Sequence, residues 1–138
     1  MKTISPKDLN NLQLQTLLQT AISPRPIALA STVDKDGNVN LSPFSFFNMF
    51  SSNPPVVIFS PARRVRDNTT KHTLENVLEV PEVVIGIVNF KIVQQISLAS
   101  TEYEKGVNEF TKSGLTMKDA DFVKPKLIED CPVNLECK

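Results

Sequence analysis

The sequence predicts a mainly β domain with helical decorations, in which helices pack on a strand-rich core as in an α+β protein or a decorated barrel. Period-two patterning at 27–33 and at 131–137 indicates two strands with distinct faces. The apolar run 83–90 indicates a further strand. A length of 138 residues suits a single domain spanning 1–138.

Composition and charge narrow the class of protein. Hydrophobic residues make up 41% and charged residues 22%, which is ordinary for a soluble globular protein. Fifteen basic and fifteen acidic residues leave no net charge, which argues against a nucleic-acid binder. No apolar run approaches the roughly 18 residues of a membrane helix. Residues 1–19 lack the apolar stretch of a signal peptide, so we expect a cytoplasmic protein with no membrane association.

The N-terminal segment 1–22 is expected to form a helix and a lead-in to the domain. Ser5 followed by Pro6 is typical of an N-cap and a first helical position. Leucines then recur at helical spacing, which predicts a helix over about 6–20. The helix should end before Ser23–Pro26, because two prolines in four residues cannot continue it.

The next segment predicts a hairpin and a short strand. Strand 27–33 is followed by a polar turn at 34–38, where Gly37 can adopt positive φ, and 39–42 would return as the partner strand. The phenylalanine-rich stretch 43–53 is assigned no element. After two prolines, 56–59 is expected to be a short buried strand.

Helices alternate with strands in the second half. The sequence predicts helices at about 73–79, 91–100 and 107–113, the last closed by Gly114 in the left-handed conformation. Glu109 is interpreted as part of a mobile connection that makes surface contacts. Cys131 and Cys137 would lie about 20 Å apart in an extended strand 131–137, too far to pair, and are expected as buried thiols.

A cluster of cations precedes the helix predicted at 73–79. Positive side chains, hydroxyls and a helix start together suit a phosphate group. The alternative is a solvated charged loop with Thr70 or Thr73 as an ordinary N-cap. The cations are Arg63, Arg64, Arg66, Lys71 and His72, and the hydroxyls are those of Ser60, Thr69, Thr70 and Thr73.

The stretch 42–52 is a second candidate site. Ser45 and Asn48 lie among four phenylalanines, which suits a heteroaromatic ligand whose polar edge must be oriented. The alternative is an ordinary core or a subunit interface. Together the two stretches suggest a ligand with an aromatic end and a phosphate end. Arg25, held between two prolines, would either bind an anion or pair with an acid.

Several familiar catalytic arrangements are missing from the sequence. A single histidine excludes a multi-histidine metal centre, so no metal is expected. The sequence contains no phosphate-binding loop of the G-x-x-x-x-G-K-[ST] type, no G-x-G-x-x-G and no G-x-S-x-G.

An ordered set of motifs resembles the flavin reductase-like, FMN-binding split-barrel family. The first motif is Ser-Pro-Arg-Pro-Ile-Ala-Leu-Ala-Ser-Thr-Val-Asp-Lys-Asp-Gly at 23–37, and the second is Asn-Leu-Ser-Pro-Phe-Ser-Phe-Phe-Asn at 40–48. The resemblance covers about 21–137. It continues through Asn-Pro-Pro-Val-Val-Ile-Phe-Ser at 53–60, Lys-His-Thr-Leu-Glu-Asn at 71–76, Gly-Val-Asn-Glu-Phe at 106–110, Gly114-Leu115 and Pro-Val-Asn-Leu-Glu-Cys at 132–137.

The resemblance implies a split β-barrel that binds FMN non-covalently, usually as a homodimer with the flavin near the subunit interface. It implies no catalytic residue, since the flavin supplies the hydride chemistry. His72 departs from the aspartate that is common at this place in the family. By the same resemblance, the cofactor-binding residues would be Ser45, Phe46 and Asn48 along the flavin, Ser60 and Arg63 near the ribityl chain or phosphate, Lys71 and Thr73 at the phosphate, and also Arg25.

The activity implied is that of a flavin reductase, which transfers a hydride from NADH or NADPH to flavin and often serves a flavin-using oxygenase. The alternatives are an FMN-binding electron carrier or sensor without nicotinamide-dependent turnover, and a truncated domain without activity. The family's domain usually continues with further barrel strands. The barrel is therefore expected to be incomplete at its C-terminus, with an unpaired edge.

Overall fold

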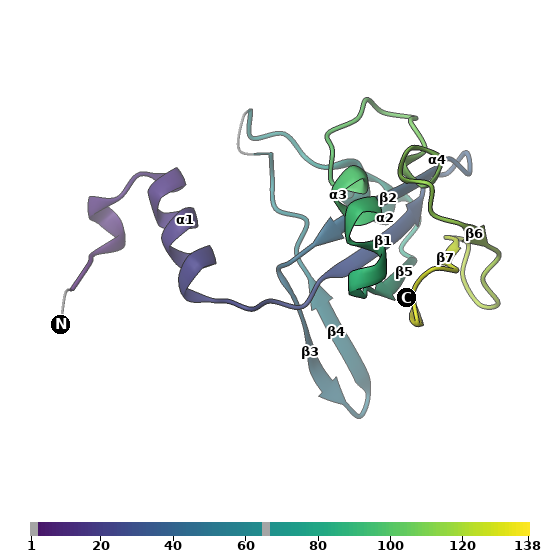
Figure 1. The fold of residues 1–138 in the computed structure, drawn as a ribbon, viewed down its shortest axis with the longest axis horizontal. Helices are drawn as coiled ribbons and strands as arrows, with labels where there is room; N and C mark the ends of the chain where they lie inside the picture. The colour runs from purple at the N-terminus through teal and green to yellow at the C-terminus, as the bar shows by residue number, and fades with distance from the viewer. Residues whose placement is uncertain (1–2, 65–66) are drawn as a thin grey trace.

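The computed structural model describes residues 3–64 and 67–138, and Arg66 of the predicted cation cluster lies outside this range. Its centre is a four-stranded antiparallel sheet with the strand order β2-β1-β5-β8 (Figure 1). The strands are β1 (Ala28–Val33), β2 (Val39–Phe44), β5 (Val83–Ile87) and β8 (Val133–Cys137). The prediction of a mainly β domain with helical decorations is confirmed, and the sheet does not close into a barrel within the described residues.

Strand β1 is the central strand of the domain. All six of its residues are buried, and it pairs with β2 on one edge and with β5 on the other. The hairpin to β2 turns where predicted. Gly37 adopts a φ of 86°, and the Asp34 carboxylate accepts the backbone N–H of Asn38 at 2.8 Å. This polar turn fixes the register that carries β2 back along β1.

A separate two-stranded ribbon projects from the sheet (Figure 1). It consists of β3 (Phe47–Ser52) and β4 (Pro55–Phe59), of which only β4 was predicted. The phenylalanine-rich stretch forms a strand because it pairs in register with β4, with a bulge after Met49. The prediction that 56–59 is buried is wrong, since Val56 and Ile58 are exposed.

The N-terminal segment differs from the helix predicted over 6–20. Ser5 caps only a single turn, η1 (Pro6–Asp8), and a second start follows at α1 (Asn11–Ala21). The second start forms because Asn10 and Gln13 make a reciprocal capping box, with bonds of 2.9 and 3.0 Å. Within the described residues α1 buries none of its side chains, and it stands apart from the sheet (Figure 1).

The remaining helices surround the sheet. They are α2 (His72–Glu79), η2 (Phe90–Ile92), α3 (Val93–Ala99) and α4 (Glu109–Ser113). The strand predicted over 83–90 ends at Ile87 because the Asn89 side chain caps η2, and the helix predicted over 91–100 is divided accordingly. Gly114 closes α4 with a φ of 74°, as predicted.

The C-terminal part completes the core. Strand β8 begins at Val133, two residues later than predicted, and a small β6 (Met117–Lys118) and β7 (Leu127–Ile128) pair were not predicted. Both cysteines of the described chain are free, Cys131 buried and Cys137 half-buried. Burial raises the pKa of the Cys131 thiol to about 11, so it stays protonated. The core cluster comprises Leu29, Leu41, Val84, Ile92, Ile96, Ala99, Phe110, Leu115, Ile128 and Cys131.

No helix in the described ranges combines the length and the apolar character that crossing a membrane requires.

Gly86 in β5 leaves room for the Cys131 side chain, and its substitution should destabilise the fold. A Cβ at this position would lie 2.7 Å from the Cys131 sulfur and 3.0 Å from Ile128 Cδ1. We expect Gly86→Ala to lower the free energy of unfolding by about 1–3 kcal/mol, measured by denaturant titration. The double variant with Cys131→Ala should lose less than the sum of the single losses, and strict additivity would contradict this contact.

Candidate functional site

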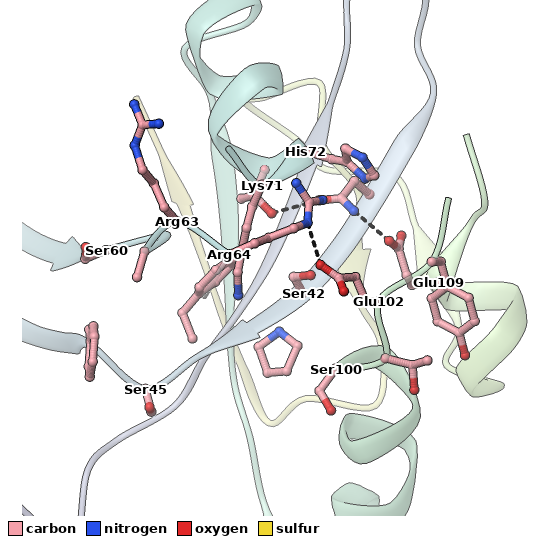
Figure 2. A pocket seen from close by; sticks show the side chains of 18 of the residues that line it. Ser42, Ser45, Ser60, Arg63, Arg64, Lys71, His72, Ser100, Glu102 and Glu109 are labelled. Atoms are coloured by element: carbon pink, nitrogen blue, oxygen red, sulfur yellow. Dashed lines mark hydrogen bonds and ion pairs between the residues drawn. The ribbon is translucent and has the colours of Figure 1, made fainter. Parts of the chain in front are cut away.

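A cavity of about 450 Å³ opens between the end of β2 and the start of α2. The cation cluster and the stretch 42–52, both singled out in the sequence, border it. The loop that follows α3 and the first residue of α4 also line it (Figure 2). Of the predicted cofactor-binding residues, those that line this cavity are Ser45, Phe46, Ser60, Arg63, Lys71 and Thr73.

One wall of the cavity is cationic. Arg64 forms an ion pair with Glu102, with Nε 2.7 Å from Oε1, and the two side chains point toward one another (Figure 2). The Arg64 guanidinium also donates to the carbonyl of Thr70, and Arg63 donates to the carbonyl of Asn68 at 2.9 Å. These bonds hold the loop before α2 so that Arg63, Arg64 and Lys71 all border the cavity.

The first turn of α2 also faces the cavity. Lys71 is the N-cap residue, and within the described residues this helix start has no side-chain cap bond. The alternative of Thr70 or Thr73 as an ordinary N-cap is therefore wrong. The N–H groups of a first turn have no intrahelical acceptor and carry partial positive charge. Lys71, His72 and Thr73 line the cavity, so this helix start adds to its positive field.

Burial and a neighbouring cation shift the ionisation of two side chains at this helix start. Burial, together with the Arg64 guanidinium, lowers the pKa of the Lys71 ammonium, and Glu102 opposes the shift. The same two causes lower the pKa of His72. A bound anion would offset both, because it favours the protonated form of each group.

The other wall of the cavity is aromatic. Phe44 is buried, and its ring lies 5.4 Å from that of Phe59 and 5.0 Å from the Lys71 ammonium. Phe46 is 41% exposed and lines the cavity beside Ser45. One cavity is thus lined both by cations and by an aromatic surface with a hydroxyl beside it.

A second cavity of about 700 Å³ lies between α1 and the β3–β4 ribbon. It contains Arg25 and Asn48, which do not line the first cavity, whereas Ser45, Phe46 and Ser60 border both. The Arg25 guanidinium lies 5.6 Å from the centre of the Phe46 ring. Its Nη1 is buried and has no hydrogen-bond partner within the described part of the chain. The acid partner considered for Arg25 is not seen there.

A buried chain of hydrogen-bonded side chains lies beside the first cavity. The sequence did not predict it. The Glu109 carboxylate accepts from the Asn40 amide at 2.7 Å and from the Leu41 backbone N–H at 3.0 Å. The Thr73 hydroxyl donates to Asn40 Oδ1 at 2.8 Å. Burial raises the pKa of Glu109 while these hydrogen bonds oppose the rise. The interpretation of Glu109 as a surface residue is wrong, since it is 4% exposed.

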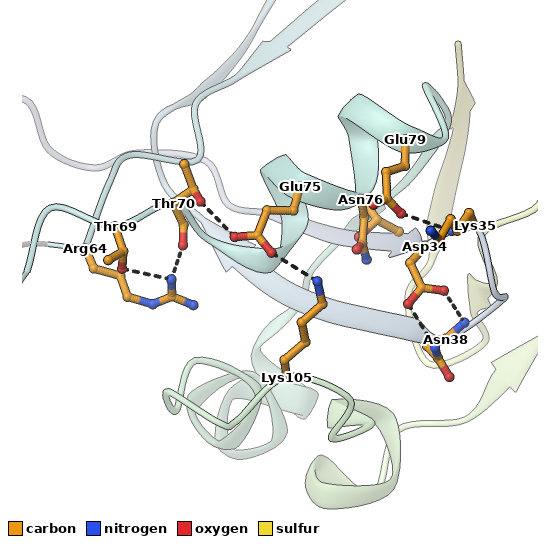
Figure 3. A network of polar contacts seen from close by, with 11 residues as sticks. Asp34, Lys35, Asn38, Arg64, Thr69, Thr70, Glu75, Asn76, Glu79 and Lys105 are labelled. Atoms are coloured by element: carbon orange, nitrogen blue, oxygen red, sulfur yellow. Dashed lines mark hydrogen bonds and ion pairs between the residues drawn. The ribbon is translucent and has the colours of Figure 1, made fainter.

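A further polar network braces the start of α2 (Figure 3). The Thr70 hydroxyl donates to Glu75 at 2.7 Å, and Lys105 lies 3.4 Å from the same carboxylate. The bond from Thr70 is the largest cause of the lowered pKa of Glu75.

Among the described residues, no group of three or more His, Cys, Asp or Glu side chains could hold a metal ion.

Comparison with known proteins agrees with this fold. Residues 20–138 match the family model described as flavin reductase like domain. The chain is 39% identical over 132 residues to an uncharacterized protein of Aquifex aeolicus, covering 96% of this chain and 67% of that protein. It is similar to the crystal structure of nitrilotriacetate monooxygenase component B from Bacillus cereus, with a TM-score of 0.93 and 27% identity over 99% of this chain and 67% of that one.

A protein of Shewanella frigidimarina with a split-barrel domain is also similar, with a TM-score of 0.77 and 25% identity over 99% of this chain and 67% of that one. The predicted split-barrel fold is thereby confirmed. The chain spans 67% of the length of the Aquifex aeolicus relative and as little as 55% of other curated relatives.

The protonation of His72 should report an anion in the first cavity. We expect the free protein to show a His72 pKa below the ordinary 6.5, so that the ring is neutral at pH 7. Saturating inorganic phosphate should raise that pKa, because an anion favours the imidazolium. The chain has one histidine, so its NMR titration needs no assignment. Chloride at equal ionic strength is the control, and an identical shift in chloride would argue against a phosphate site.

Proposed function

The chain belongs to the flavin reductase-like domain family, and we propose that it binds FMN in the first cavity and transfers electrons from NADH or NADPH to flavin. The observation that supports this most directly is that one cavity is lined by both cationic and aromatic side chains. FMN has the matching chemistry, a phosphate dianion at one end and a flat heteroaromatic ring at the other. We also propose a cytoplasmic location, because NADH and NADPH are the proposed electron donors.

The phosphate end is proposed to lie at the start of α2. Lys71 supplies a half-buried ammonium, and the first-turn N–H groups supply donors for phosphate oxygens. Ser60 and Arg63 border the same cavity and suit the ribityl chain or the phosphate. A phosphomonoester offers three acceptor oxygens, which this set of donors can satisfy together.

The ring end is proposed to lie against the end of β2. Ser45 and Phe46 form the wall shared by both cavities, so a ring placed there would reach toward Asn48 and Arg25 in the second. The buried Arg25 Nη1 could then donate to a carbonyl of the ring. The flavin supplies the hydride chemistry when bound, and this chain's residues bind and orient it.

A homodimer is proposed from the exposed apolar surfaces. Leu12, Leu18 and Ile22 of the N-terminal arm and Met49 and Phe50 of the ribbon are all more than 45% exposed. Apolar patches of this kind usually pack against another protein, and a second copy would cover both and shield the second cavity. The Bacillus cereus neighbour is a monooxygenase component, so we also propose that reduced flavin passes to a partner oxygenase.

The visible spectrum of the purified chain with added FMN tests cofactor binding first. We expect a protein-bound flavin spectrum that NADH or NADPH bleaches under anaerobic conditions, with heat-denatured protein as the control. Retention of FMN without bleaching would replace the reductase by the electron carrier or sensor. A folded protein that leaves FMN free in solution would refute the proposal.

Lys71→Ala should weaken FMN binding by about 1–3 kcal/mol, because it removes a charge-assisted contact with the phosphate. Riboflavin lacks the phosphate, so its affinity should stay the same. Isothermal titration with both ligands measures the difference. Lys112→Ala removes an equal charge from an exposed position on α4 outside the cavity and serves as the matched control. Equal FMN affinity of the Lys71 variant and the control would remove Lys71 from the phosphate site.

A further inference from the structure

Glu109, Asn40 and Thr73 form a buried chain of hydrogen bonds that joins three elements of the fold. Glu109 begins α4, Asn40 lies in β2, and Thr73 lies in the first turn of α2. All three side chains are at most 7% exposed, and all three border the first cavity. The chain therefore connects a buried carboxylate to the helix start that faces the cavity.

The direction of this chain follows from the chemistry of the carboxylate. An ionised carboxylate only accepts hydrogen bonds, so Asn40 must turn its NH₂ group toward Glu109, at 2.7 Å. The Asn40 carbonyl oxygen then faces Thr73, whose hydroxyl donates to it at 2.8 Å. The hydroxyl hydrogen of Thr73 is thus committed to the interior. The group that Thr73 can offer a phosphate as a donor is its backbone N–H.

We propose that Glu109 is a positioning residue for the phosphate end of the bound flavin, acting through Asn40 and Thr73. The inference rests on the proposed function, because it concerns the same cavity. Glu109 fixes the orientation of the Asn40 amide, and Asn40 holds the Thr73 side chain. Thr73 in turn holds the first turn of α2, where the phosphate donors lie.

Loss of the carboxylate should loosen this turn selectively. In Glu109→Ala the Leu41 N–H and the Asn40 amide lose their acceptor, so neither Asn40 nor Thr73 is held in one orientation. The groups proposed for the flavin ring, Ser45 and Phe46, lie past the end of β2 and have no bond to this chain. FMN should therefore lose affinity and riboflavin should not.

Glu109→Gln separates positioning from charge. The Gln carbonyl can accept from Leu41, and its NH₂ group can donate to Asn40 once the Asn40 amide has flipped. Asn40 then donates to the Thr73 hydroxyl, so all three side chains stay bonded with the chain running in reverse. Removing the negative charge favours a nearby phosphate equally in the Ala and Gln variants. At equal charge, the two variants differ in whether the three side chains stay bonded, and the Gln variant also releases the Thr73 hydroxyl hydrogen from Asn40.

The test measures FMN and riboflavin dissociation constants for the wild type and both variants. We expect Glu109→Ala to bind FMN about tenfold more weakly than Glu109→Gln does, with riboflavin unchanged within about twofold. If Glu109→Ala does not fold, Asn40→Ala cuts the same chain in its middle, leaves Glu109 bonded to Leu41, and should show the same selective loss.

Thr32→Val is the matched control. Asn76 of α2 donates to Thr32 of β1 at 3.1 Å, an equally buried bond between helix and sheet at residues that do not line the first cavity. This variant should lower the Tm while leaving the ratio of FMN to riboflavin affinity unchanged. A parallel loss of both ligands in Glu109→Ala, or an unchanged ratio, would overturn the positioning role. Failure of the wild type to bind FMN would instead overturn the proposed function.

Discussion

The burial of β1 with both edges paired is the constraint on which the rest of the structure depends. A buried strand must find partners for its backbone groups; β2 pairs along the whole of β1, and β5 pairs with Ala28–Ser31 on the other edge. The pairing with β2 fixes where Asn40 and the following phenylalanines lie. Helix α2 packs against the same strand. The cationic and aromatic stretches meet across one cavity because both are tied to β1.

Several positive groups gather around that cavity, and not all of them have an acidic partner among the contacts described above. Arg64 has an acidic partner in Glu102, while Lys71 rests against the Phe44 ring with its pKa lowered by burial and by Arg64. The uncapped start of α2 adds partial positive charge at the same place. Such a concentration of donors costs free energy that an anion would recover.

Local patterns in the sequence predicted those structural features that are determined by residues close together in the chain. Period two predicted β1, the polar turn predicted its return as β2, Gly114 predicted the end of α4, and the cluster of cations predicted the polar wall of the cavity. The Asn40–Glu109 bond joins residues 69 positions apart, and no local signal marks either member as buried. The helical pattern of α1 was correct in type, but Asn10 rather than Ser5 sets its start, and none of its side chains is buried in the described chain.

The two edges of the main sheet differ in what lies beside them. The first cavity opens beside β2, whereas β8 forms the opposite edge, two strands beyond the centre. Backbone groups on the outer side of β8 can pair with additional strands without moving Asn40, Phe44 or the start of α2. Additional strands could therefore extend the sheet at that edge while the residues that line the first cavity keep their places.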